Sequence, residues 1–255
     1  MQRSSYAIAF AISLVATWAL AQQERDEPGF TPLFNGRDFT GWVITAGPSD
    51  AAKAWSVREG GVIDVSGKQP GSWLRSERSY KDFILRLEYT IAQRENSGIF
   101  LRSRKEGNPA YSGMEIQIYG DDPWRAPDIH SNGALYASIP PACSPARNGE
   151  WNELEIELRG MHLIEQQNGI TVLDVRLDDP VWNQRIVEYN KELAAAWKAA
   201  QPSLTARLSG KKPKTPVKKK APIPLLTERV KEGYIGLQNH GSPVQFHNIR
   251  IKVLQ

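Results

Sequence analysis

Cysteine is almost absent from this sequence, because Cys143 is the only one in 255 residues. A single thiol excludes an internal disulfide, so the stability of the fold must come from a hydrophobic core. Apolar residues make up 40% of the chain, which is enough to build the core of a large domain. Cys143 lies in the proline-rich stretch IPPACSPARNG without a neighbouring His or second Cys, so we interpret it as structural or incidental.

Long apolar runs are absent after residue 21, so we expect no segment of the mature chain to span a membrane. Residues 1–21 combine Arg3, an apolar stretch of about a dozen residues and the closing Ala19-Leu20-Ala21, the pattern of a cleaved signal peptide. An N-terminal membrane anchor, the alternative, needs an apolar run of about 20 residues. We therefore expect a mature chain of residues 22–255 that is secreted or periplasmic.

An excess of one charge is confined to one segment. The net charge is +4, and much of it comes from residues 209–224, SGKKPKTPVKKKAPIP. This run lacks interleaved aromatic residues, so we expect no nucleic-acid partner. The preceding residues predict an amphipathic helix from the three- and four-residue spacing of apolar side chains, namely Trp182, Ile186, Tyr189, Leu193 and Trp197.

We interpret residues 179–230 as an insertion that consists of this helix and a solvated loop. A scaffold role, in which the helix and the lysines meet a partner, is the alternative. The rest of the chain consists of short alternating stretches such as DFILRLEYTI and WNELEIELRG, separated by Gly, Pro, Asn and Asp. This pattern predicts a single all-β domain, an antiparallel two-sheet sandwich of jelly-roll type.

One stretch, GMEIQIYGDD, raises a functional question. Met114, Ile116 and Ile118 alternate with Glu115 and Gln117, so the apolar and polar side chains point to opposite faces of a strand. A carboxylate beside an amide on one sheet face is suited to a carbohydrate groove. The alternative is a carboxylate that pairs with a neighbouring Arg on a solvated face.

Six motifs follow one another along the chain: FTPLFNGRDFTGW, NSGIFLRS, GMEIQIYGDD, GALY, GEWNELEIELRG and GYIGLQNHGSPVQFHNIRIK. Together they resemble the 3-keto-disaccharide hydrolase domain family, long known as a domain of unknown function. The match runs from about Phe30 to the C-terminus and is interrupted at residues 179–230. The resemblance implies a fold like that of concanavalin A-type lectins and glucanases. It also implies a secreted bacterial protein that acts on glycosides oxidised to a ketone at C3.

A ketone at C3 acidifies the proton on C2, so a base can start elimination of the substituent on C1, and water can then add back. This route needs a base, a group that stabilises the enolate oxygen, and a proton donor for the leaving oxygen. We predict Glu115 as the base, Arg102 of GIFLRS at the oxyanion, and His240 of LQNHG as the second acid-base group. A direct attack on C1 is disfavoured because it usually needs a pair of carboxylates.

The expected substrate-binding residues are polar or aromatic side chains near these groups, namely Gln117, Gln238, Asn239, Tyr136, Trp124 and His130. We assign no cofactor, although a divalent metal, calcium or a transition metal, is a candidate. Its ligands would come from Asp121, Asp122 and Asp128, but the loop lacks the D-x-D-x-D-G spacing of a calcium site. The predicted function is cleavage of 3-keto-glycosides, and the alternative is a non-catalytic, lectin-like carbohydrate-binding module.

Overall fold

The structure is a computed structural model that describes residues 27–200 and 221–255. The expected signal peptide and residues 209–220 of the lysine-rich run lie outside the described residues. No helix among the described residues is long and apolar enough to cross a membrane.

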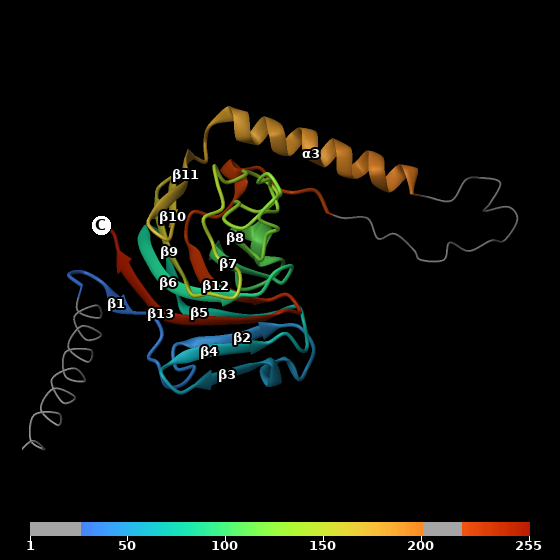
Figure 1. Ribbon diagram of the computed structural model, residues 1–255. Helices are drawn as coiled ribbons and strands as arrows, with labels where there is room; N and C mark the ends of the chain where they lie inside the picture. The colour runs from blue at the N-terminus through green and yellow to red at the C-terminus, as the bar shows by residue number, and fades with distance from the viewer. Residues whose placement is uncertain (1–26, 201–220) are drawn as a thin grey trace, which may run out of the picture.

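Two antiparallel sheets pack face to face (Figure 1). The larger sheet, of eight strands in the described residues, has the order β11-β10-β9-β6-β13-β4-β3, with β1 added to β13. The smaller sheet has five strands in the order β2-β5-β12-β7-β8. These arrangements confirm the expected two-sheet sandwich of jelly-roll type.

The strands of the larger sheet are β1 (Thr31–Pro32), β3 (Trp55–Arg58), β4 (Val62–Ser66), β6 (Phe83–Ile91), β9 (Asn152–Arg159), β10 (His162–Gln167), β11 (Ile170–Arg176) and β13 (Pro243–Val253). Those of the smaller sheet are β2 (Trp42–Ala46), β5 (Ser72–Tyr80), β7 (Asn96–Ser103), β8 (Met114–Tyr119) and β12 (Gly233–Asn239). The helical elements are η1 (Ala51–Ala54), α2 (Pro109–Ser112), α3 (Pro180–Ala199) and η2 (Leu226–Glu228).

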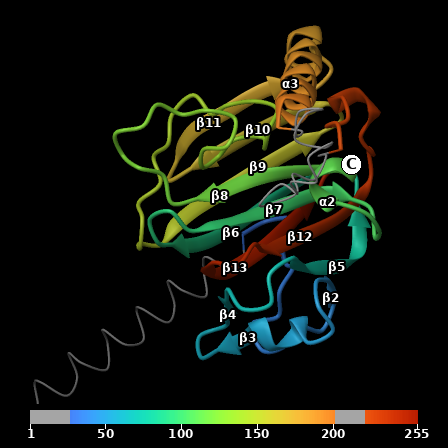
Figure 2. The same ribbon diagram turned by 90° about the vertical axis from the view of Figure 1, so that its right-hand side faces the viewer.

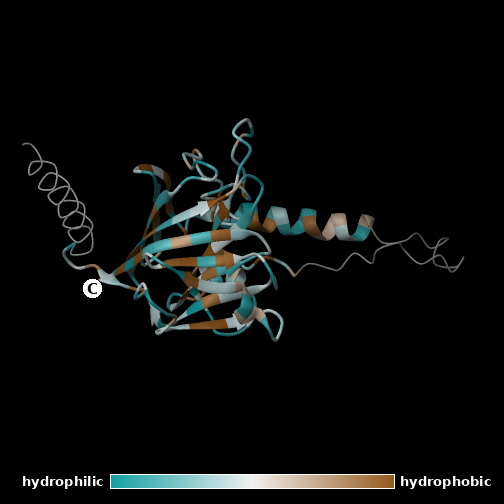
Figure 3. Cartoon of the chain, turned by 60° about the horizontal axis from the view of Figure 1, so that its bottom comes forward, coloured by the Kyte–Doolittle hydropathy of each residue, from teal (hydrophilic) through white to brown (hydrophobic). Residues whose placement is uncertain are grey.

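The core lies between the two sheets and follows from the alternation in the sequence. Every second residue of β6 is buried, and β9 repeats the pattern beside it, with Leu85 opposite Ile156. Both side chains belong to one continuous apolar cluster. Apolar and polar residues are accordingly interspersed along the strands (Figure 3). Burial of these apolar faces is the main force that holds the sheets together.

Strand β8 is buried on both faces, and another segment pairs along its outer edge. The backbone N–H of Gln117 donates to Ala134 (2.9 Å), and that of Tyr136 donates to Glu115 (2.9 Å). The segment GALYASI alternates apolar and polar residues only in part, and the structure has isolated bridges there, from Leu135 to Ile116 and to Ile139. The chain bends at Ala137, whose φ is 55°, so the ladder cannot continue.

Helix α3 confirms the amphipathic helix predicted in residues 179–230. Asp179 caps its first turn by accepting a hydrogen bond from the N–H of Val181, and Pro180 occupies the first helical position. Ile186 is fully buried against the sandwich. In two perpendicular views the helix lies along one end of the sandwich (Figures 1 and 2).

Candidate functional site

The outer face of the five-stranded sheet, the face turned away from the core, carries the candidate site. Strand register sets its members, because directly paired residues share a face. Phe100 pairs with Glu115, Gly98 with Gln117, and Gln238 with Trp73. Ala110 of α2 packs on Trp73 and Phe100 and covers part of this face.

Two glycines inside strands make room for the side chains on the outer face. A Cβ on Gly98 would overlap the carboxylate of Glu115. A Cβ on Gly236 would overlap the ring of Trp73. Glycine weakens a strand interior, and its presence there marks a close approach of another group. The Glu115 side chain can therefore lean across β7 towards β12.

Glu115 is the titrating group of the site. Its side chain is almost wholly buried, with 4% exposed, and Oε1 accepts a hydrogen bond from Nε2 of Gln238 (3.0 Å). Burial raises the pKa of Glu115 to about 8, and the bond from Gln238 only partly opposes this shift. A carboxyl with a pKa near the working pH can both take and return a proton, so Glu115 is suited to acid-base chemistry.

Tyr136 lies beside Glu115 on the same face. Leu135 bridges to Ile116 on the core side, so the next residue, Tyr136, shares the face of Glu115. Burial, together with the charges of Tyr111, Glu115 and Tyr189, raises the pKa of Tyr136 to about 12. Burial likewise raises the pKa of Tyr111, with the charge of Glu115 as the next cause. Both hydroxyls therefore remain protonated at neutral pH and can donate hydrogen bonds.

His130 continues this cluster away from the sheet. Its ring meets that of Tyr136 edge to face at 5.3 Å between centroids, and its Nε2 lies 3.3 Å from the hydroxyl of Tyr189 in α3. The sequence analysis missed Tyr111 and Tyr189 as site residues. The spacing of Tyr189 had marked it only as a packing residue of the helix, and Tyr111 lies in a short helical turn that no strand pattern includes.

The prediction that Arg102 lies beside Glu115 was wrong. Arg102 has a φ of 49°, and the pairing of β7 with β12 shifts register at this point. This bulge breaks the alternation with Phe100 and turns the guanidinium away from the outer face. Arg102 instead donates to the carbonyl of Gly160 (2.7 Å) and to Oδ1 of Asp82 (2.9 Å). Its role is to join the strand turns at one end of the sandwich.

Strand β12 places three predicted site residues in different environments. Gln238 contacts Glu115, as described above. Asn239 is fully buried, and its amide donates to the carbonyl of Lys68 (2.7 Å) while its oxygen accepts from the N–H of Gly241 (3.1 Å). This bonding contradicts the prediction that Asn239 is available to a sugar. His240 is exposed in the following turn, and its acid-base role stays a prediction.

Gln117 shares the outer face with Glu115, as predicted, but both are more deeply buried than an open groove would leave them. Gln117 is 3% exposed, and its Nε2 donates to Oδ1 of Asn96 (3.2 Å). Trp124 is the opposite case, because 93% of its surface is exposed on the loop after β8. Stacking of Trp124 on a sugar is sterically open and stays a prediction.

The three aspartates proposed as metal ligands hold the loop after β8 in shape. Each accepts a hydrogen bond from a loop N–H: Asp121 from Asn132 (2.8 Å), Asp122 from Trp124 (3.2 Å) and Asp128 from His130 (2.8 Å). No three His, Cys, Asp or Glu side chains in residues 27–200 and 221–255 are placed to hold one ion together. The aspartates therefore do not form a ready-made ligand set, and the metal stays a prediction.

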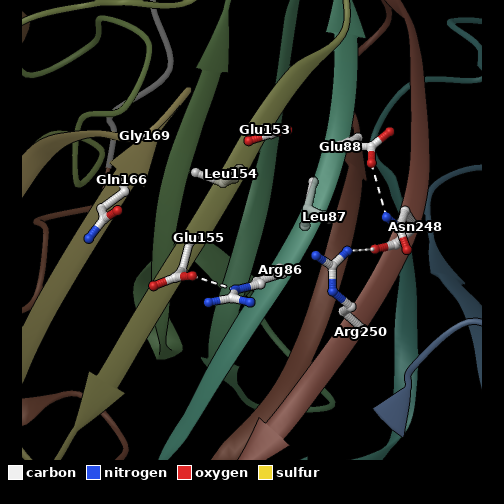
Figure 4. Close-up of a pocket in the computed structure, with 10 residues that line it drawn as sticks. All are labelled: Arg86, Leu87, Glu88, Glu153, Leu154, Glu155, Gln166, Gly169, Asn248 and Arg250. Carbon is white, nitrogen blue, oxygen red and sulfur yellow. Dashed lines mark hydrogen bonds and ion pairs between the residues drawn. The ribbon is translucent and has the colours of Figure 1, made fainter. Parts of the chain in front are cut away.

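A shallow hollow on the outer face of the eight-stranded sheet is the alternative site (Figure 4). Two of its carboxylates are already bonded: Glu155 pairs with Arg86, and Glu88 bonds with Asn248 and with the neighbouring His247. The pKa of Glu88 is lowered, mainly by the hydrogen bond with His247. Such a carboxylate is ionised at neutral pH and already bonded, so Glu88 is less suited than Glu115 to exchange a proton.

A second buried carboxyl belongs to Glu165 of β10, on the inner face of the larger sheet. Burial raises its pKa to about 8, and Oε1 accepts a hydrogen bond from Nε2 of Gln167 (2.8 Å). Glu165 matches Glu115 in burial and in titration but lies in the core, away from the outer face. It is therefore an internal control for the role of Glu115.

Known proteins match both the sequence and the fold. The family model described as the 3-keto-alpha-glucoside-1,2-lyase-like domain matches residues 29–252. A Bacteroides thetaiotaomicron protein named 3-keto-disaccharide hydrolase is 28% identical over 255 residues, which covers 90% of this chain and 80% of that protein.

Two crystal structures from Parabacteroides distasonis, each described as a "putative glycosyl hydrolase", share the fold. One has a TM-score of 0.65 at 24% identity and covers 91% of this chain and 97% of its own. The other has a TM-score of 0.59 at 21% identity, with coverage of 88% and 99%. The family match spans most of the chain, so the protein belongs to the 3-keto-alpha-glucoside-1,2-lyase-like domain family.

Proposed function

We propose that the protein is an exported enzyme that cleaves glycosides whose sugar carries a ketone at C3. One observation carries this proposal: Glu115, on the outer face of the five-stranded sheet, is a buried carboxyl with a pKa raised to about 8. The family and the name of the Bacteroides thetaiotaomicron relative support the substrate class.

In this route Glu115 removes the proton from C2, and the electrons form the enolate of the C3 ketone. The enolate then expels the oxygen on C1, which takes a proton from His240, the second acid-base group, and an enone is left. His240 recovers this proton from the water that adds in the next step, while Glu115 returns its own proton to C2. Water thus adds across the enone, with its hydroxyl on C1 and a proton on C2. The charge of Glu115 acts on the pKa of both Tyr111 and Tyr136, so their neutral hydroxyls lie in its neighbourhood, and we assign them the ketone oxygen in place of Arg102.

Replacement of Glu115 by Gln tests the proposal. The amide keeps the shape but cannot accept the proton, so we expect release of the aglycone from a 3-keto-glucoside to fall by at least a hundredfold. Binding of the same glucoside, measured by calorimetry, should remain within about threefold, because the contacts with the sugar persist. The unoxidised parent glucoside should not be cleaved by either protein.

Glu165→Gln is the matched control, since it neutralises a carboxyl with the same burial and a similar pKa outside the site. It should retain turnover close to that of the unmodified protein. Equal activity of Glu115→Gln and the unmodified protein would refute the role of Glu115. Binding of the keto-glucoside without any release by the unmodified protein would instead favour the lectin-like module. A parallel assay with a chelator tests the predicted metal.

A further inference from the structure

Helix α3 contributes a side chain to the neighbourhood of Glu115, although its residues lie within the segment interpreted as an insertion. The hydroxyl of Tyr189 reaches Nε2 of His130 (3.3 Å), and the two ring centroids are 6.1 Å apart. His130 in turn contacts the ring of Tyr136. Three rings thus form a continuous row that leads from Glu115 to α3.

Contacts at residues before and after Tyr189 fix the position of this side chain in α3. Asn190, the next residue, exchanges two hydrogen bonds of 2.8 Å with the backbone of Ile223. Asn183 accepts from the N–H of Leu226 (2.9 Å), and Ile186 between them is fully buried. These contacts tie the middle of the helix to residues 223–226, near the end of the segment interpreted as an insertion. Asn183, Ile186 and Asn190 are spaced by three and four residues, so they lie on one face of the helix. Tyr189, three residues after Ile186, adjoins this anchored face and is not part of a free appendage.

The surface of this row is suited to carbohydrate. His130, Tyr136 and Tyr189 are each half-buried, so part of each residue is accessible to solvent. Aromatic rings present a flat apolar face with a polar tip, which suits the C–H face and the hydroxyls of a sugar. Tyr136 adjoins Glu115, whereas Tyr189 lies two ring contacts further out. When a sugar is bound at Glu115 for cleavage, the unit joined to its C1 can contact the outer rings, those of His130 and Tyr189.

We infer that Tyr189 of α3 forms an aromatic subsite, together with His130, for the second sugar of the substrate. This inference rests on the proposed function and assigns the insertion a part in substrate selection. Tyr189 contacts the leaving unit and not the reacting atoms, so its loss should weaken binding of a two-sugar substrate. A glycoside with a methyl aglycone does not reach the subsite and should be insensitive.

The test compares a 3-keto-disaccharide with methyl 3-keto-glucoside as substrates of the Tyr189→Ala protein. We expect KM for the disaccharide to rise about three- to tenfold, the effect of one aromatic contact, with kcat within twofold. Both constants for the methyl glycoside should stay within twofold. Tyr189→Phe, which keeps the ring, should recover most of the loss. Lys191→Ala, an exposed change in the same helix, should alter neither substrate.

Equal effects of Tyr189→Ala on both substrates, or no effect on either, would overturn the subsite. Thermal unfolding of each variant identifies a general loss of structure. If Tyr189→Ala shows such a loss, the two substrates are compared with Tyr189→Phe instead. Absence of turnover in the unmodified protein would count against the proposed function alone. In that case, the affinity of Glu115→Gln for the keto-disaccharide, with and without Tyr189→Ala, still tests the subsite, and an unchanged Kd would refute it.

Discussion

Glu115 keeps its proton to a higher pH than a carboxyl in water does, because burial penalises its charged form. The consequence for catalysis depends on its role. A base must be ionised, and below a pKa of about 8 the ionised fraction falls tenfold for each pH unit. The residue therefore sets a pH dependence that can be measured on the intact protein.

We expect kcat/KM for a 3-keto-glucoside to rise with pH and to level off above about pH 8, because this ratio reports the ionisation of the free enzyme. The measurement is the initial rate of aglycone release at low substrate from pH 5.5 to 9.5. A rate that falls through pH 8 would show that Glu115 acts in its protonated form, as an acid, which would contradict the proposed base.

At the scale of elements, the bulge at the end of β7 makes Arg102 a structural residue and not a site residue. Arg102 is 1% exposed and donates to backbone carbonyls and to Asp82 in the β5–β6 turn. Its guanidinium joins this turn to the β9–β10 turn through Gly160. A buried cation with several acceptors holds separate elements in register, and its removal leaves those acceptors unpaired.

Arg102→Met should therefore lower the free energy of unfolding by about 3 kcal/mol, as measured by urea denaturation. The activity of each folded molecule should persist, since the guanidinium does not face Glu115. Arg104→Met, an exposed change two residues along the chain, should leave the stability within about 0.5 kcal/mol. Full stability of Arg102→Met combined with lost turnover would return Arg102 to the catalytic group.

For the whole molecule, the two buried carboxyls make stability depend on pH. The pKa of Glu165 is about 8 in the folded state, whereas an unfolded Glu titrates near 4.5. The folded state therefore binds the proton of Glu165 more tightly. The contribution of Glu165 to the free energy of unfolding is fully present below about pH 4.5 and is lost as the pH rises through 8. Glu88, whose pKa is lowered, acts in the opposite sense below that window.

We expect the free energy of unfolding to be lower at pH 8.5 than at pH 5 by an amount on the order of a few kcal/mol. Glu165→Gln, which cannot ionise, should flatten this dependence, while the contribution of Glu115 remains. Urea unfolding at the two pH values measures the difference for both proteins. An equal slope in the two proteins would show that Glu165 titrates normally in the folded state.

Local periodicity in the sequence was enough to predict several elements. The alternation in β6 and β9 predicted both strands and their core faces, and the spacing of apolar residues predicted α3. The prediction that Glu115 and Gln117 point away from the core was also confirmed, because side chains alternate strictly along a strand. Gly98 and Gly236, inside strand patterns, were signals of close approach that the sequence analysis did not use.

The groups that lie near Glu115 depend on tertiary packing, which local sequence patterns do not predict. A bulge of one residue removed Arg102 from the outer face, and no periodicity predicts where a bulge falls. Tyr189 and Tyr136 are 53 positions apart in the chain and meet through His130 because α3 folds back over the sandwich. Local pattern fixes the direction in which a side chain points. Its partners follow from how distant segments pack to bury apolar surface, and that information is not local.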